Sequence, residues 1–115
     1  KVPSIQENAL LSDAVLEISI KGLGFTAIIN NQSEPIGMFT DGDLRRQLSK
    51  KMDYEKQPIK DIMNKTPKTI FDDQIIIDAI NLMELNKING ILVVNRENKL
   101  IGAFNMHDLF KAKVI

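Results

Sequence analysis

Apolar positions along the chain fall into short blocks that alternate between helical and extended spacing. In the first half, positions i, i+3, i+4 and i+7 mark one buried helix face, formed by Leu11, Ala14, Val15 and Ile18. Two apolar runs, 26–29 and 36–39, flank a turn-rich stretch and predict a β-hairpin. A short extended segment at 2–5 precedes this pattern, and a second helix is predicted over about 40–51.

Polar and glycine residues predict where the first helix begins and ends. The Asn8 side chain is suited to cap this helix, because it can accept a hydrogen bond from a free backbone N–H. Gly22 and Gly24 are predicted to end the helix, since glycine tolerates the left-handed backbone conformation.

The second half of the chain shows the same succession of elements. Asp73 is predicted to cap a helix whose apolar face is formed by Ile76, Ala79, Ile80 and Met83. Extended runs at 66–70, 91–94 and 100–104 accompany that helix, and a last helix is predicted to start near Asn105.

A constant offset of 65 residues relates the two halves without a gap, from 2–50 to 67–115. We therefore predict an α+β fold of two β-α-β-β-α repeats, residues 1–57 and 58–115. Neither repeat can cover both faces of its small sheet alone. The two sheets are expected to pack face to face with pseudo-two-fold symmetry.

Composition excludes several classes of function. The 115-residue chain has a formal net charge of zero, which gives no electrostatic basis for binding nucleic acid or an anionic membrane. It has no cysteine and one histidine, so no metal site is expected. No apolar run is long enough to span a bilayer, and the chain does not begin with Met. We expect a soluble, cytoplasmic fragment of a larger protein that requires no cofactor.

Similar polar motifs follow the last strand of each repeat. Thr40-x-x-Asp43 comes after the first hairpin, and Asn105-x-x-Asp108 comes after the second. Ligands of layered α/β proteins bind beyond the carboxyl ends of strands, so both corners are candidate sites. Thr40 and Asp43 also have the spacing of a capping box, which needs no ligand. Asp41 is expected at the rim of the cleft, because the further ligands of a calcium loop are absent.

Together, these repeats resemble a tandem pair of CBS domains over the whole chain. The resemblance rests on the corners and on 59–63 with Pro67, Ile36-Gly37 and Ile101-Gly102. Residues 21–25 and 39–46 are further similar to the C-terminal CBS pair of D-arabinose 5-phosphate isomerases of the sugar isomerase family. That family joins a sugar-phosphate isomerase domain to the CBS pair and supplies arabinose 5-phosphate for Kdo, a sugar of lipopolysaccharide and some capsules.

The resemblance implies that a nucleotide binds between the repeats. In CBS pairs the corner Asp binds the ribose hydroxyls, a role that falls to Asp43 and Asp108 in this sequence. The corner Ser or Thr helps to hold phosphate, a role that falls to Thr40. Asn105 departs from this pattern, although its amide can still donate a hydrogen bond.

Further candidate residues surround the two corners. Ser4 and Thr69 fall on the early extended segment that contacts the base in CBS pairs. Arg45 and Arg46 could bind a phosphate or a sugar carboxylate, although a solvated helix face is the simpler interpretation of either one alone. His107 could stack on a base or respond to pH, although a plain surface histidine is the simpler interpretation.

The resemblance implies a regulatory module and not an independent enzyme. The expected ligand is CMP-Kdo, the end product of the pathway, or an adenine nucleotide such as AMP or ATP. A ligand clamped between the repeats would favour one relative placement and so bias an attached isomerase domain. CBS pairs usually form flat dimers, so a homodimer within a larger homo-oligomer is expected. The alternatives are a ligand-free dimerisation scaffold and a CBS regulator of another enzyme or of a transporter.

Overall fold

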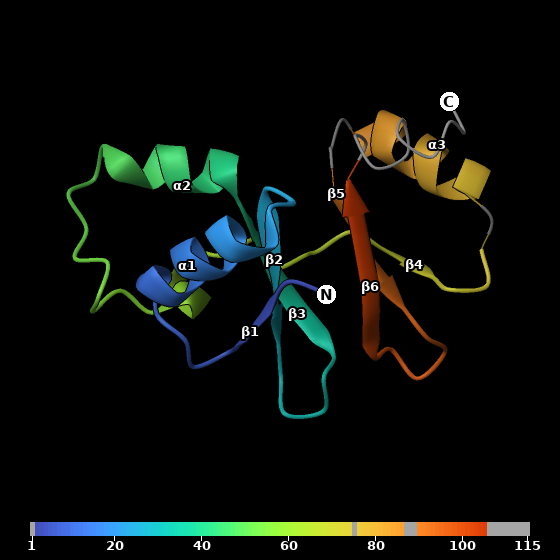
Figure 1. Ribbon diagram of the computed structural model, residues 1–115, viewed down its shortest axis with the longest axis horizontal. Coiled ribbons are helices and arrows are strands. Elements are labelled where there is room, and N and C mark those ends of the chain that lie inside the picture. Colours follow the sequence, from blue (N-terminus) through green and yellow to red (C-terminus); the bar gives the residue numbers. More distant parts are fainter. Residues whose placement is uncertain (1, 75, 87–89, 106–115) are drawn as a thin grey trace.

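Two three-stranded sheets, one from each half of the chain, stand at the centre of the molecule (Figure 1). The structure is a computed structural model, and it describes residues 2–74, 76–86 and 90–105. The helices of the first half lie on the left of its sheet in Figure 1, and the helix of the second half lies on the right. The sheets therefore face each other, with helices on the outside.

Repeat 1 has the predicted order of elements. They are β1 (Ser4–Gln6), α1 (Leu11–Lys21), β2 (Phe25–Ile29), β3 (Pro35–Thr40) and α2 (Asp41–Leu48). β1 runs parallel to β2, and β2 runs antiparallel to β3, so the sheet order is β1-β2-β3. All five residues of β2 are buried, because this central strand is covered on both faces.

Repeat 2 forms the same sheet after a connector that contains a short 3₁₀ helix, η1 (Ile59–Asp61). Its elements are β4 (Thr69–Phe71), α3 (Ile76–Asn86), β5 (Gly90–Val94) and β6 (Leu100–Asn105). The sheet order is β4-β5-β6, with the first pair parallel and the second antiparallel. The last predicted helix lies outside the described residues, and the repeat boundaries at 1–57 and 58–115 stay a prediction.

The strand register confirms the offset of 65 between the repeats. Ser4 pairs with Ala27, and Thr69 pairs with Leu92, which are the same two positions shifted by 65. Both hairpins also shift register at equivalent places, between Ile28 and Ile29 in one sheet and between 93 and 94 in the other. The duplicated sequence therefore produces a duplicated backbone.

The predicted start of the first helix is wrong. Helix α1 begins at Leu11, and the Leu10 N–H donates to the Asp13 carboxylate at 2.9 Å. Asn8 lies outside the helix because Asp13, three residues into it, already provides the acceptor for the first turn. The end was predicted correctly, since Gly22 closes the helix with a φ of 74°.

Two other helix limits also differ from the prediction. Helix α3 begins at Ile76, and the Asp73 carboxylate pairs instead with the Arg96 guanidinium at 2.7 and 2.8 Å. Helix α2 ends at Leu48 and not near 51, because the backbone turns there and Lys51 adopts a φ of 51°.

Three apolar clusters form the core of the part of the chain that the structure describes. One packs α1 and the connector on the first sheet, and one packs α3 on the second. The third lies between the two sheets and consists of Phe25, Ala27, Ile29, Met38 and Leu92. This third cluster confirms that the repeats pack sheet against sheet. Among the described residues, no helix has the length and apolar composition needed to cross a membrane.

Candidate functional site

The first corner is a closed capping box at the junction of β3 and α2. The Thr40 hydroxyl accepts a hydrogen bond from the Asp43 N–H at 3.0 Å. In return, the Asp43 carboxylate accepts one from the Thr40 N–H at 2.9 Å. These two bonds satisfy backbone donors that the helix leaves free at its first turn. They also fix the orientation of both side chains.

The second carboxylate oxygen of Asp43 pairs with the Arg46 guanidinium. The Arg46 side chain is 70% exposed, whereas the Asp43 side chain is only 21% exposed. Arg45 is exposed on the neighbouring position of the same helix. An ion pair with so exposed an arginine is weak, so Arg46 can leave Asp43 at little cost in free energy.

Asp41 binds the segment that joins α1 to β2. Its backbone N–H donates to the Gly24 carbonyl oxygen at 2.9 Å. Gly24 has a φ of 86°, and a Cβ at this position would lie 3.5 Å from the Asp41 carboxylate. The Asp41 side chain is exposed, and its place at the rim of a cleft stays a prediction.

Asn105, at the second corner, binds the same segment from the other repeat. Its side-chain amide donates to the Leu23 carbonyl oxygen at 3.2 Å. The two corners therefore hold consecutive carbonyl groups, those of Leu23 and Gly24. The structure brings Asn105 and the Thr40–Asp41 corner to either side of one short segment.

Ser4 and Thr69 lie on edge strands, away from the corners. Each is half-buried, and the central strand of its sheet separates it from its corner. The Ser4 N–H donates to the Glu17 carboxylate at 3.1 Å. The structure therefore brings together only part of the predicted set. His107 and Asp108 lie outside the described residues.

Glu17 is a charged residue that sequence reasoning did not select. Its carboxylate accepts hydrogen bonds from the Ser4 N–H and from the Lys21 ammonium group. Burial raises the pKa of Glu17, but these bonds and the Lys21 charge outweigh it, so the pKa lies below its usual value. Glu17 is thus a negative charge that fastens β1 to α1.

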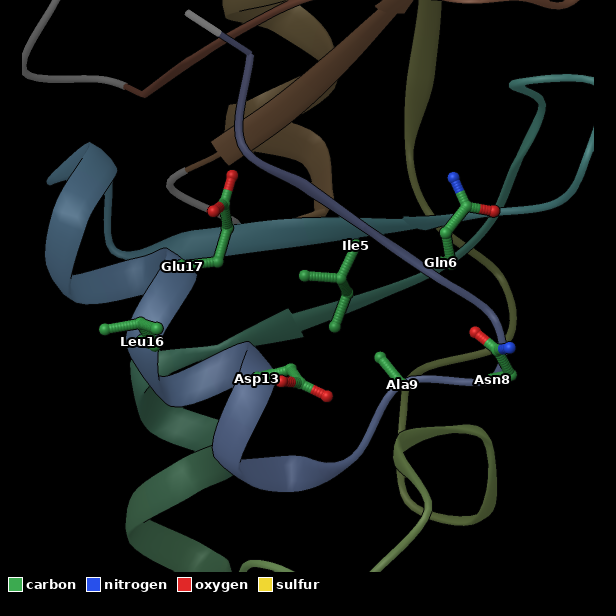
Figure 2. A pocket seen from close by; sticks show the side chains of 7 residues that line it. All are labelled: Ile5, Gln6, Asn8, Ala9, Asp13, Leu16 and Glu17. Carbon is green, nitrogen blue, oxygen red and sulfur yellow. The ribbon is translucent and has the colours of Figure 1, made fainter.

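A surface pocket of about 410 Å³ lies beside Glu17, between β1 and α1 (Figure 2). It is lined by Ile5, Gln6, Asn8, Ala9, Asp13, Leu16 and Glu17. Both of its carboxylates have backbone partners, because Asp13 accepts from the Leu10 N–H and Glu17 accepts from the Ser4 N–H. Across the described residues, no group of three acidic, His or Cys side chains could hold a metal ion.

The Leu23 and Gly24 carbonyls were also missed as parts of the site. The available signal was the pair of glycines at 22 and 24, which were interpreted only as a helix end. Both have positive φ values, 74° and 86°. This backbone turns its carbonyl groups toward the two corners, which no side-chain motif would indicate.

Comparison with known proteins identifies the family. The family model of the CBS domain matches residues 1–50 and 59–115. Arabinose 5-phosphate isomerase KdsD of Pseudomonas aeruginosa is 36% identical over 114 residues, which is 99% of this chain and 35% of that protein. KdsD of Yersinia pestis is 36% identical over 115 residues, again covering 35% of its length. The chain thus spans about a third of the curated relatives it matches.

Solved structures share the fold at lower sequence identity. The CBS domain protein PAE2072 from Pyrobaculum aerophilum, complexed with AMP, superposes with a TM-score of 0.86 at 23% identity, covering 94% of this chain and 82% of that one. The CBS-domain containing protein ATU1752 from Agrobacterium tumefaciens gives 0.84 at 16% identity, covering 99% and 85%. With a duplicated sequence, a duplicated sheet and a family model that matches both halves, this chain belongs to the CBS domain family.

Proposed function

We propose that this chain is the regulatory, nucleotide-sensing CBS pair of a D-arabinose 5-phosphate isomerase. The observation that carries the proposal is the convergence of both corners on the carbonyl groups of Leu23 and Gly24. Two relatives at 36% identity are named arabinose 5-phosphate isomerase, which supports this enzyme as the regulated partner. The module itself does not catalyse the isomerisation.

The ligand would bind at the first corner through its phosphate and ribose. The Thr40 hydroxyl can donate a hydrogen bond to a phosphate, and the N-terminus of α2 offers it a favourable dipole. Asp43 would accept bonds from the ribose hydroxyls after Arg46 has moved to the phosphate. Arg45 lies on the same exposed turn and would add positive charge. Asp41 would form the rim.

The free energies favour this exchange of partners at Asp43. A surface ion pair such as Asp43–Arg46 contributes about 0 to 1 kcal/mol. Hydrogen bonds from ribose hydroxyls to a carboxylate contribute about 1.5 to 3 kcal/mol each. A nucleotide therefore gains more at Asp43 than the departing arginine loses.

The proposed second half of the site comes from repeat 2. Asp108 would bind ribose there, and His107 would stack on or lie near a base. Asn105 is engaged with Leu23, so we expect the second corner to bind phosphate less strongly than the first.

Two ligand classes fit these groups. PAE2072, which shares the fold, is described as complexed with AMP, and this favours an adenine nucleotide such as AMP or ATP. The alternative is CMP-Kdo, whose sugar carboxylate would pair with Arg45 or Arg46. Binding of either would favour one relative placement of the repeats and transmit it to the isomerase domain of a cytoplasmic homodimer or larger oligomer.

A ligand-free scaffold is the second candidate function, and one observation favours it. The Thr40–Asp43 capping box is complete without any ligand. In that case the CBS pair would hold isomerase domains together as a dimer, and mutation of Asp43 would change only stability. Regulation of a different enzyme or of a transporter would use the same site.

A thermal-shift screen separates these functions. CMP-Kdo, CMP, AMP and ATP are added to the wild-type chain, to Asp43→Asn and to Asp61→Asn, an exposed aspartate in η1 that serves as control. Sensing predicts a rise in Tm with at least one ligand for the wild type and Asp61→Asn, and little or none for Asp43→Asn. No shift with any ligand, or equal shifts in all three proteins, would contradict sensing.

A further inference from the structure

The connector between the repeats completes the core of repeat 1. Ile59 is fully buried in that core, although it follows the last helix of the repeat. The Ile59 N–H donates to the Ala9 carbonyl at 3.0 Å, and the Leu11 N–H donates to the Gln57 carbonyl at 2.8 Å. Repeat 1 is therefore finished by the residues that lead into repeat 2.

The same connector also covers the outer edge of β3. The Met38 N–H donates to the Asn64 carbonyl at 3.0 Å, and the Asn64 N–H donates to the Met38 carbonyl at 2.9 Å. The Met63 side chain fills the space over Gly37, where a Cβ would lie 2.9 Å from the Met63 Cγ. The outer edge of β3 is thus paired by the Asn64 backbone and covered by the Met63 side chain.

Repeat 2 presents an equivalent edge on β6. Ala103 lies opposite Leu92, as Met38 lies opposite Ala27, in the same register. Backbone groups alternate in direction along an antiparallel strand, so Ala103 directs its N–H and C=O away from β5. In the part of the chain that the structure describes, no bridge to Ala103 accompanies the one to Met38.

The edge of β6 is less buried than the edge of β3, as expected if no segment packs on β6. Residues 37–39 of β3 are buried, whereas the equivalent residues 102–104 of β6 are only half-buried. Ile101 is 45% exposed. Among the described residues, a Cβ on Gly102 would meet only Val93 of the neighbouring strand, at 3.4 Å, whereas a Cβ on Gly37 would meet the Met63 side chain of the connector. We call residues 101–104 the β6 edge.

We propose that the residues directly upstream of Lys1 in a longer protein dock on the β6 edge, as the connector docks on β3. The offset of 65 places the counterpart of Met63 three positions before Lys1 and that of Asn64 two positions before it. The curated relatives have the length to supply such residues, because this chain covers 35% of them. A second copy of the chain is the rival occupant.

The path of the chain into each repeat supports this occupant. The Ala27 N–H donates to the Pro3 carbonyl at 3.0 Å, and the Leu92 N–H donates to the Lys68 carbonyl at 3.1 Å. These pairs are equivalent, so the chain enters β1 along the path by which it enters β4. The docking itself does not depend on nucleotide binding.

Docking would also fasten an upstream domain to repeat 2 and not to repeat 1. A change in the relative placement of the repeats would then move the entry point of that domain. This regulatory consequence rests on the proposed function, whereas the docking can be measured without any ligand.

The test extends the chain with its own connector sequence. A copy of residues 59–65 (IKDIMNK) is fused directly before Lys1, and a matched control carries Asp in place of the methionine. We expect the first extension to raise Tm by about 4 °C or more and to slow hydrogen exchange of the Ala103 N–H at least tenfold relative to the control. Equal Tm and exchange rates in the two proteins would overturn the proposal.

Protein concentration distinguishes the two occupants. Docking within one chain predicts slowed exchange at Ala103 that is the same at low and high concentration. Protection that grows with concentration would show that the segment binds another copy, and this would contradict the proposal.

Discussion

The ring of Phe25 lies over the Cα of Gly90, its own counterpart in the other repeat. A Cβ on Gly90 would come within 2.6 Å of the Phe25 Cδ2 and 3.0 Å of its Cζ. Phe25 is 3% exposed and belongs to the cluster between the sheets. The two repeats therefore cannot carry the same large side chain at this position, because the Phe25 ring already fills the space next to Gly90.

Gly90→Ala should destabilise the contact between the repeats. The added methyl group would overlap the Phe25 ring, and overpacking of this kind costs about 1 to 3 kcal/mol. Urea unfolding followed by circular dichroism measures the free energy. Gly42→Ala is the control, since among the described residues the nearest contact of its Cβ would be the Thr40 hydroxyl at 3.6 Å. In a Phe25→Ala background Gly90→Ala should cost less, and an unchanged cost would contradict the overlap.

Thr40→Ala should lower the stability of the chain by about 1 kcal/mol. The Thr40 hydroxyl accepts the Asp43 N–H at the start of α2, and alanine offers no acceptor. Thr40→Ser keeps the oxygen and should stay within a few tenths of the wild type, by the same unfolding measurement. If serine and alanine had equal effects, the capping bond would have no energetic role.

Asn105→Asp should loosen the second corner from the segment between α1 and β2. The amide that donates to the Leu23 carbonyl at 3.2 Å is replaced by a group that only accepts, so two acceptors face each other. We expect a loss of about 1 to 3 kcal/mol in unfolding free energy. Asn31→Asp, at an exposed position, serves as the matched control. Equal stability of the two variants would argue against the bond to Leu23.

Acid should weaken the link between β1 and α1 through Glu17. The folded pKa of Glu17 lies below 4.5, the value of an unperturbed glutamate, so the unfolded chain binds more protons in this range. The stabilisation is present above pH 4.5 and is lost as the pH falls through the folded pKa. Glu17→Gln should flatten the dependence of stability on pH below 4.5, as measured by thermal unfolding at several pH values. A titration of Glu17 by NMR with a midpoint above 4.5 would reverse this sign.

Helical and extended periodicity was enough to predict the repeated fold. The α1 face of Leu11, Ala14 and Ile18 is buried as the spacing required. Local competition for hydrogen bonds was harder to predict. Asn8 and Asp13 both offer an acceptor near the start of α1, and only the backbone path shows that Asp13 is used.

The candidate site could be predicted only in part. The Thr40–Asp43 corner follows from a local motif, because both residues lie in one helical turn. The contact of Asn105 with Leu23 joins residues 82 positions apart and depends on how two sheets pack. The edge positions of Ser4 and Thr69 likewise depend on strand order, which periodicity does not encode.

Isothermal titration calorimetry tests most directly whether a nucleotide binds at the first corner. AMP and CMP-Kdo are each titrated into the wild-type chain and into Asp43→Asn, which retains an oxygen to accept the Thr40 N–H. We predict saturable binding of at least one of them to the wild type and affinity at least tenfold weaker for Asp43→Asn, the loss of about 1.5 kcal/mol expected for one charge-assisted bond. Absence of heat with both ligands, or equal affinity of the two proteins, would contradict a nucleotide site at Asp43.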